Sequence, residues 1–581
     1  MKRLLRYMKG YRVYAVIGPL FKWLEALFEL LVPLVVASLI DKGIPSGMAG
    51  DTSPIWRDFG ILALLGVVGF LCSLTAQYFS AKAATGVAAE LRSAMFNHMQ
   101  SLSYTSLDRI GNATIISRLT GDLNLVQNGV NMFLRLFLRS PFVVLGAMIM
   151  AFTVDVEASL VFVPAILLLF AAVAVIMKLT VPRYKEVQNK SDSLYHTVGE
   201  NITGVRVIRA FGMEGAERRR FHGEADDLTG FQIAANRISA LMNPVTFVII
   251  NMAMLILIRS GAVRVDAGGL TQGEVIALVN YMSQILVELI KLANLIITVT
   301  KGIAAGGRIA DFLDTTTEAD ELIVGDDGGI FDDDIAVSFE GVSFTYPDAA
   351  SPSLENISFT MKRGETLGII GPTGSGKTTL VNLIPRFYDA TKGNITVCGR
   401  RIGNIPVDEL RRMIGIAEQR SNIFSGTVRD NLSMGKTVSE DELSSAVKIA
   451  QAADFIEKRD GRFDAVLSRG GKNLSGGQRQ RLNIARALAK APEILILDDS
   501  ASALDFATDA ALRKALGKLD GMSVIIISQR AASVRHADNI LVLDDGEAVG
   551  FGKFRELLES CPVFEEICIS QGIEGGVSDE A

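Results

Sequence analysis

Cysteine and histidine, the side chains that most often build disulfide frameworks and metal centres, are scarce in this chain. Four of each occur in 581 residues. The cysteines, Cys72, Cys398, Cys561 and Cys568, form no CxxC pair, so they indicate neither a disulfide framework nor a zinc site. The four histidines show no metal-ligand spacing either.

Charge is also in short supply. Charged residues make up 21% of the chain and the formal net charge is −6, which gives no reason to expect a nucleic acid partner. Apolar residues make up 49% and the mean hydropathy is +0.32, values that argue against a soluble protein of this length.

Long apolar runs are present instead, and all of them precede residue 315. They lie near 14–40, 59–81, 138–154, 158–178, 240–260 and 273–298. A membrane span needs about 20 such residues. Six runs buried in a soluble core would leave too little polar surface to cover them, so we expect six transmembrane helices surrounded by membrane lipids.

Basic residues predict which ends of these helices face the cytoplasm. The chain starts with Lys2, Arg3, Arg6, Lys9 and Arg12, and long polar segments of helical periodicity separate the second run from the third and the fourth from the fifth. Both segments are rich in arginine and lysine, so they and the N-terminus are predicted to be cytoplasmic. The short loops near 42–58 and 261–270 then face outward.

Two runs carry polar stripes. Lys22, Glu25 and Glu29 share one face of the first, and the sixth carries a second set on one face. That second set contains Asn280, Gln284, Glu288 and Lys291. Polar groups at membrane depth are costly and usually face a bundle interior or a water-filled cavity. The stripes therefore predict a translocation path for a polar or amphipathic solute, or else ion pairs such as Glu288–Lys291 and Lys22–Glu25 that serve packing.

Composition changes after the sixth run. Residues 315–335 are rich in acid and glycine and predict a linker, and beyond it strands, helices and Gly-rich turns predict an α/β domain. We expect a helical membrane domain at 1–314 with six transmembrane helices and long cytoplasmic extensions. It is fused to an α/β domain at 336–572 and followed by a flexible tail at 573–581.

A P-loop opens this second domain. An apolar strand at 367–370 runs into Gly371, Pro372, Thr373, Gly374, Ser375, Gly376, Lys377, Thr378 and Thr379, and a helical stretch follows. Glycines let backbone N–H groups wrap phosphates, Lys377 reaches the β and γ oxygens, and Thr378 ligates Mg²⁺. Asp498 ends another apolar strand and is the expected partner in the Mg²⁺ shell. The α/β domain at 336–572 is therefore predicted to be a P-loop nucleotide-binding domain.

About 100 residues after the P-loop, the chain reads Asn473, Leu474, Ser475, Gly476, Gly477 and Gln478. With this signature the chain resembles the ATP-binding-cassette family along essentially its whole length. Six spans fused to one C-terminal cassette resemble a half-transporter of the exporter-type fold. In this family two cassettes pair head to tail, and each ATP lies between one P-loop and the other cassette's signature.

The resemblance implies further roles. Tyr346 resembles the aromatic residue that stacks on adenine, and Gln419 resembles the glutamine that senses Mg²⁺ and contacts the membrane half. The loop that crosses the dimer interface is expected at Ser502, Ala503, Leu504 and Asp505. ATP and Mg²⁺ are the implied cofactors, and segments near 114–116 and 212–214 are expected to couple the cassettes to the membrane half.

Three positions depart from the family pattern. Asp499 stands where the catalytic glutamate polarises the attacking water, and Gln529 replaces the histidine that contacts the γ-phosphate. Ser468 stands where exporters often carry a glutamate that touches the opposing membrane half. A shorter carboxylate and a glutamine that cannot become cationic weaken hydrolysis but leave ATP binding intact.

The pattern resembles the degenerate-site half of heterodimeric bacterial exporters. We therefore expect a multi-pass plasma-membrane protein with a cytoplasmic cassette. ATP hydrolysis at its own P-loop should be slow. Its signature should serve a partner half-transporter that carries the glutamate and the histidine. The solute would be amphipathic: a drug, a lipid or a peptide. The alternatives are an importer on the exporter fold, an ATP-gated regulatory subunit and a slow homodimer.

Overall fold

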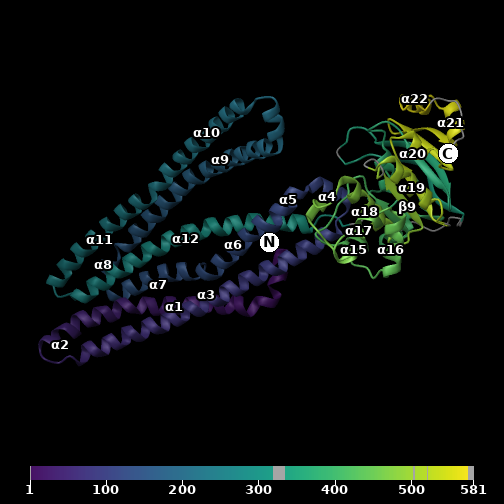
Figure 1. The fold of residues 1–581 in the computed structure, drawn as a ribbon. Helices are drawn as coiled ribbons and strands as arrows, with labels where there is room; N and C mark the ends of the chain where they lie inside the picture. Colours follow the sequence, from purple (N-terminus) through teal and green to yellow (C-terminus); the bar gives the residue numbers. More distant parts are fainter. Residues whose placement is uncertain (1, 318–333, 348, 501–503, 520, 574–581) are drawn as a thin grey trace. The chain divides into compact units, whose positions relative to one another are not determined.

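The computed structural model describes residues 2–317, 334–347, 349–500, 504–519 and 521–573. The chain divides into two compact units (Figure 1). Unit 1 holds Met1–Gln100 and Ala113–Asp314, and unit 2 holds Ser101–Asn112 and Thr315–Ala581. Most of the predicted linker and all but the first residue of the predicted tail lie outside the described residues.

The described part of unit 1 is built from helices joined by short turns. Its long helices are α1 (Arg12–Ser38), α3 (Ser53–Ser101), α6 (Leu123–Leu136), α7 (Arg139–Val154), α9 (Phe162–Ala210), α10 (Glu214–Ala240), α11 (Met242–Asp266) and α12 (Gln272–Leu313). Short helical segments join them: η1 (Lys2–Tyr11), η2 (Leu39–Gly43), α2 (Ile44–Met48), α5 (Asn112–Ser117), η3 (Arg118–Asp122) and α8 (Val156–Ser159).

Among the described residues, six helical stretches of this unit are long and apolar enough to cross a membrane. Every backbone group of an α-helix is bonded within the segment, which is what the hydrocarbon core demands. The α3 and α9 helices have 49 residues each. At about 1.5 Å per residue they reach roughly 70 Å, well beyond a core of roughly 30 Å. The predicted fold, six membrane helices with long extensions, is confirmed for this half of the chain.

Small side chains let the membrane helices pack closely. The α6 and α12 helices meet at Gly129 and Gly302, where a Cβ on either residue would lie 3.1 Å from the other's Cα. Ala26, Ala147 and Ala277 are fully buried between α1, α7 and α12. Without a hydrophobic drive between helices in lipid, such close van der Waals contact is the main source of their association.

Unit 2 is an α/β domain. Its four-stranded sheet has the order β2 (Leu354–Lys362), β1 (Ile335–Phe344), β4 (Lys392–Val397), β5 (Arg400–Arg401). Its six-stranded sheet has the order β12 (Glu547–Gly552), β11 (Asn539–Asp544), β3 (Thr366–Ile370), β10 (Ser523–Ile527), β9 (Ile494–Asp498), β6 (Ile414–Ala417). A further pair joins β7 (Gly426–Thr427) to β8 (Val466–Leu467).

Helices cover these sheets. They are α13 (Lys377–Leu383), α14 (Val407–Met413), α15 (Val428–Ser433), α16 (Glu440–Ile449), α17 (Ala453–Ile456), α18 (Gly476–Leu488), α19 (Phe506–Leu516), α20 (Ala531–Val534), α21 (Phe554–Ser560) and α22 (Pro562–Ser570), with short 3₁₀ turns at Ile402–Asn404, Arg462–Asp464 and Arg469–Gly471. Strands β11, β3, β10, β9 and β6 run parallel, and only β12 of this sheet is antiparallel. Buried on both faces, these strands read as apolar runs.

One short piece of the membrane half belongs to the cassette. Residues Ser101–Asn112, which include α4 (Tyr104–Ile110), cluster with unit 2. Tyr388 donates a 2.6 Å hydrogen bond to Asp108, and the rings of Tyr104 and Phe387 lie 4.6 Å apart. Ser101–Asn112 groups with the cassette because these side chains of α4 pack on it. The membrane-domain bounds of 1–314 and the coupling near 114–116 stay predictions.

Candidate functional site

Three neighbouring strands bring the nucleotide motifs to one edge of the large sheet. Strands β3, β10 and β9 are parallel, and Ile527 pairs with both Ile369 and Asp498. The carboxyl ends of the three strands therefore lie side by side. The P-loop, the two carboxylates after β9 and the Ser528–Gln529 loop consequently meet at this edge, although they are far apart in sequence.

The P-loop has the backbone that phosphate binding requires. Gly374 and Gly376 adopt φ values of +92° and +93°, a region in which an L side chain is strained. A Cβ at Gly376 would also lie 2.7 Å from the Leu354 side chain. Lys377 opens α13 directly after these residues. Backbone N–H groups at such a turn and helix start are suited to binding an anion, so the phosphate-binding role of this loop stays a prediction.

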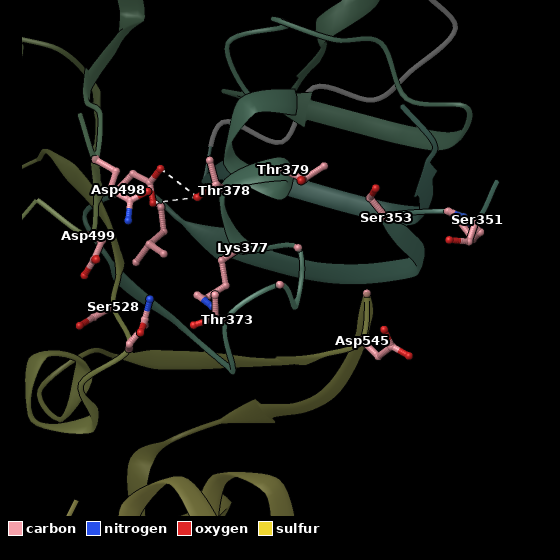
Figure 2. A pocket seen from close by; sticks show the side chains of 17 residues that line it. Ser351, Ser353, Thr373, Lys377, Thr378, Thr379, Asp498, Asp499, Ser528 and Asp545 are labelled. Atoms are coloured by element: carbon pink, nitrogen blue, oxygen red, sulfur yellow. Dashed lines mark hydrogen bonds between the residues drawn. The ribbon is translucent and has the colours of Figure 1, made fainter. Parts of the chain in front are cut away.

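Lys377 lies in the centre of the site, as Figure 2 shows. Its Nζ donates to the carbonyl oxygens of Gly371 at 2.9 Å and Pro372 at 2.6 Å. Burial lowers the pKa of Lys377, and the negative charges of Asp499 and Asp498 oppose that shift. This ammonium group is thus held beside the P-loop carbonyls.

Oxygen ligands suited to Mg²⁺ meet beside the P-loop. The Thr378 hydroxyl donates to both carboxylate oxygens of Asp498 at 3.1 and 3.2 Å (Figure 2). Burial raises the pKa of Asp498, and the hydrogen bond from Thr378 acts in the opposite direction. Gln419 lines the same pocket. A hydroxyl, a carboxylate and an amide oxygen fit Mg²⁺, which takes a few protein oxygens and completes its shell with waters and phosphates.

These groups line a pocket of about 410 Å³. Part of its lining was not predicted from the sequence: Ser351, Pro352, Ser353, Asp545 and Gly546. In Figure 2, Ser351, Ser353 and Asp545 lie across the P-loop from Asp498 and Asp499. They come from the loop before β2 and from the turn between β11 and β12. A 2.9 Å hydrogen bond from the Glu355 amide, at the start of β2, to the Gly546 carbonyl holds the two segments together. Neither loop carries a recognisable sequence motif.

Tyr346, the expected adenine-stacking residue, is tied to the P-loop through a hydroxyl pair. Its Oη lies 3.2 Å from Oγ1 of Thr379. Its ring contacts Phe344 and Tyr388 at centroid distances of 4.8 and 5.2 Å. Tyr346 is not among the residues that line the described pocket, so its role in stacking on adenine stays a prediction.

Asp499 lines the pocket from the end of β9. Its amide donates to the Ile527 carbonyl at 3.0 Å, and its φ is +43°, in the left-handed region that aspartate tolerates better than most residues. Burial raises the pKa of Asp499; a hydrogen bond from Gln419 and the charges of Arg530 and Lys377 act against that rise. The carboxylate is therefore present at the expected position, on a shorter side chain.

Gln529 also lines the pocket, next to Ser528. Ser528 is buried, and its amide donates to the Ile369 carbonyl at 3.1 Å, which ties this loop to the strand before the P-loop. The structure thus brings Gln529 to the pocket that Lys377, Thr378 and Asp498 line. A contact between residue 529 and the γ-phosphate stays a prediction.

The signature does not contribute to this pocket. Ser475 and Gln478 form a reciprocal capping box at the start of α18, with Gln478 N to Ser475 Oγ at 3.3 Å and Ser475 N to Gln478 Oε1 at 3.0 Å. Leu474 is buried beneath them, whereas Ser475 and Gly476 are exposed. Among the described residues that line the pocket, none belongs to 474–478. The signature is thus folded and available to a second molecule.

Two further predicted features lie near the site. Ser502 and Ala503 of the expected interface loop fall outside the described residues, Leu504 is buried, and Asp505 caps α19 by accepting from the Thr508 amide at 2.9 Å. Ser468 bonds Asn473, with 3.1 Å between Ser468 Oγ and Asn473 Oδ1. The position that often carries a glutamate in exporters therefore holds the loop before the signature in place.

The polar stripes of the membrane half form ion pairs. Glu288 of α12 accepts from Lys291 at 2.8 Å and from Arg139 of α7, and Arg139 also donates to Glu29 of α1 at 2.5 Å. Arg139 was not predicted from the sequence. It is buried, as is Glu288. Both predicted pairs are present, since Lys22 also donates to Glu25 at 2.6 Å.

A cavity of about 420 Å³ lies beside this cluster, between α1 and α12. Its lining mixes carboxylates, amides and a hydroxyl with apolar groups: Glu29, Val32, Pro33, Val36, Asn280, Ser283, Gln284, Val287 and Glu288. The Gln284 Oε1 atom is buried without a hydrogen-bond partner among the described residues. The predicted ion pairs therefore coexist with a polar cavity.

Comparisons with known proteins agree with this architecture. The family model for the ABC transporter transmembrane region matches residues 15–289, and the ABC transporter model matches residues 354–502. The uncharacterized ABC transporter ATP-binding protein YfiB of Bacillus subtilis is 33% identical over 100% of both chains. The ATP-dependent lipid A-core flippase of Hahella chejuensis is 29% identical over 96% of this chain and 97% of its own length.

A solved structure shares the fold. The structure of a bacterial Atm1-family ABC exporter with ATP bound aligns with a TM-score of 0.79 at 22% identity, covering 99% of each chain. Six apolar helices, a C-terminal α/β domain and an ordered P-loop pocket fit this likeness. The chain belongs to the ABC transporter family, as a multi-pass membrane half-transporter of the exporter fold whose cassette is that of an ATP-hydrolysing transporter.

Proposed function

We propose that this chain is one half of a heterodimeric exporter and that its own P-loop forms the slower of two ATP sites. One observation carries the proposal. Asp499 and Gln529 line the same pocket as an intact set of nucleotide-holding groups, Lys377, Thr378 and Asp498. The two altered positions are those expected to act on water and on the γ-phosphate, whereas the residues expected to hold ATP and Mg²⁺ match the family pattern.

The reach of the carboxylate explains the slow step. Asp499 has one methylene fewer than glutamate, which withdraws its oxygens by roughly 1.5 Å. Misplacement of about 1 Å costs on the order of 10²-fold in rate. Gln529 donates a hydrogen bond but brings no positive charge to the transferring phosphoryl group. Mg²⁺ held by Thr378, Asp498 and Gln419 would neutralise charge on the β and γ oxygens.

The exposed signature supports a second half. Ser475 and Gly476 face solvent and lie outside the chain's own pocket, so a partner's P-loop is their expected target. The partner would then carry glutamate and histidine at the two altered positions and perform most of the hydrolysis. In this scheme ATP closes the two cassettes, hydrolysis at the partner's site resets them, and the slow site stays occupied.

The cavity between α1 and α12 suggests the kind of solute. Its carboxylates and amides lie beside valines and a proline, a mixture that suits an amphipathic molecule. Relatives named as lipid A-core flippases support a lipid-like solute over a small ion. Glu29, Asn280, Gln284 and Glu288 are the path residues that line this cavity.

Native mass spectrometry of the tagged chain, purified gently from its own membranes, tests the proposal. A one-to-one complex with a second half-transporter that retains ATP is the expected result. A homodimer would overturn it and would favour the slow homodimer or an ATP-gated regulatory subunit. Import in a vesicle assay with the one-to-one complex would keep the degenerate site but reverse the direction.

A further inference from the structure

The C-terminal helix α22 ends on the loop that carries Gln529. Gln571 directly follows α22, and its Nε2 donates to the Gln529 carbonyl at 2.7 Å. Its Oε1 accepts from the Ala531 amide at 2.8 Å. One side-chain amide therefore satisfies a main-chain acceptor and a main-chain donor that are two residues apart, as the peptide group of a neighbouring strand would.

These two bonds fix the main chain on both sides of Arg530. On the sheet side, the Ser528 amide is bonded to the Ile369 carbonyl, and the Ser528 hydroxyl accepts from the Arg530 amide at 3.0 Å. On the other side, Gln571 holds the Gln529 carbonyl and the first amide of α20. The direction in which the Gln529 side chain leaves the loop depends on both attachments.

The helix that presents Gln571 is itself well anchored. Phe564 and Cys568 of α22 are fully buried in a cluster with Ile370, Val534 and Val542. Ile370 is the last residue of β3, immediately before the P-loop. Gln571 thus stands on a rigid support that also packs behind the P-loop strand, so the loop is positioned relative to the phosphate site and not merely capped.

We propose that Gln571 is a positioning residue for the contact between residue 529 and the γ-phosphate. Its amide sets the main chain from which the Gln529 side chain projects into the pocket. Through Gln571, helix α22 is thereby connected to the loop that faces the γ-phosphate position. The inference rests on ATP binding at this chain's own P-loop and is independent of the heterodimer proposed above.

The experiment measures how strongly this chain prefers ATP over ADP. The tagged full transporter is photolabelled with 8-azido-ATP, and labelling of this chain, resolved on a gel, is competed with ATP or with ADP. ADP lacks the γ-phosphate, so a defect at position 529 weakens ATP binding alone. Loss of one or two hydrogen bonds predicts a fall of about threefold to tenfold in the ATP preference.

Four variants and one control separate positioning from folding. Gln571→Ala should lower the ATP preference, and Gln571→Glu, which keeps the size but places an oxygen against the Gln529 carbonyl, should lower it at least as much. Gln529→Ala should show the same loss, and Gln529→Ala with Gln571→Ala no further loss. Ser570→Ala is the matched control, because among the described residues the Ser570 hydroxyl bonds only the Ile567 carbonyl of its own helix.

Three results would overturn the inference. The first is an unchanged ATP preference in both Gln571 variants. The second is an equal loss of ATP and ADP affinity, which would indicate a general defect of the pocket. The third is an additive loss in the double variant. Since Gln571→Glu preserves the helix and its packing, it decides the question even when the alanine variant folds poorly.

Discussion

Replacing Asp499 with glutamate and Gln529 with histidine should restore hydrolysis at this chain's own P-loop. Asp499 already lines the pocket, and burial raises the pKa of its carboxyl group. We infer that the main defect of this carboxylate is its short reach. One added methylene moves the carboxylate forward by roughly 1.5 Å.

The magnitude follows from that displacement. A misplacement of about 1 Å costs on the order of 10²-fold, so Asp499→Glu with Gln529→His should raise turnover at this site by about 10- to 100-fold. This corresponds to about 1.4–2.7 kcal/mol of transition-state stabilisation. The matched control is Asp499→Asn with Gln529→His, which has the same histidine but no base and should stay at the original rate.

The assay needs the other ATP site to be silent. Steady-state ATP hydrolysis is therefore measured in a Ser475→Trp background, because the exposed Ser475 would serve the partner's P-loop in a heterodimer. Equal rates for the glutamate and asparagine variants would refute the argument from reach. A gain that appears with Ser475 intact and vanishes with Ser475→Trp would instead show that the chain's own signature faces this P-loop, as in a homodimer. Thermal unfolding checks that glutamate is tolerated at a φ of +43°.

Three further perturbations test other parts of the structure. Burial raises the pKa of Asp498 above 3.8, so this carboxylate takes up a proton at a higher pH than an ordinary aspartate. Mg²⁺-dependent ATP binding should therefore weaken as the pH falls through that range, and Asp498→Asn should abolish this pH dependence. Arg139→Met leaves the buried Glu288 with only one cationic partner and should lower the free energy of unfolding by about 3–5 kcal/mol in thermal or chemical denaturation, with partial recovery when Glu288→Gln is added. Tyr388→Phe keeps the ring but removes the bond to Asp108, so amide hydrogen exchange over residues 104–110 should accelerate by about tenfold or more, whereas Asp108→Asn, which retains an acceptor, should have a smaller effect.

The sequence predicted the phosphate-holding part of the site because that chemistry is local. A P-loop must be one continuous strand, turn and helix, so Lys377 and Thr378 are recognisable from spacing alone. Asp498 is recognisable because it ends an apolar strand. Ser353 and Asp545 were not predicted, since they reach the pocket through the arrangement of separate loops, and no residue pattern in those loops indicates a phosphate or a base.

The membrane half shows the same limit. The two stripes were predicted from helical periodicity, which places residues on one face of one helix. Arg139 lies on a third helix, and its pairing with Glu29 and Glu288 depends on how α1, α7 and α12 pack. Gln571 was missed for the same reason, because its partners are main-chain atoms of a loop 40 and 42 positions earlier.

The grouping of Ser101–Asn112 with the cassette has a consequence for how the protein is made. Tyr388 follows Asp108 by 280 positions, so at ribosomal rates the acceptor of their hydrogen bond precedes its donor by an interval on the order of tens of seconds. During that time α4 has no cassette to pack against. A fragment that starts at the linker never acquires α4 at all and leaves the ring of Phe387 without its neighbour Tyr104. The surface of the cassette around Phe387 and Tyr388 is therefore completed by a segment that is synthesised long before it.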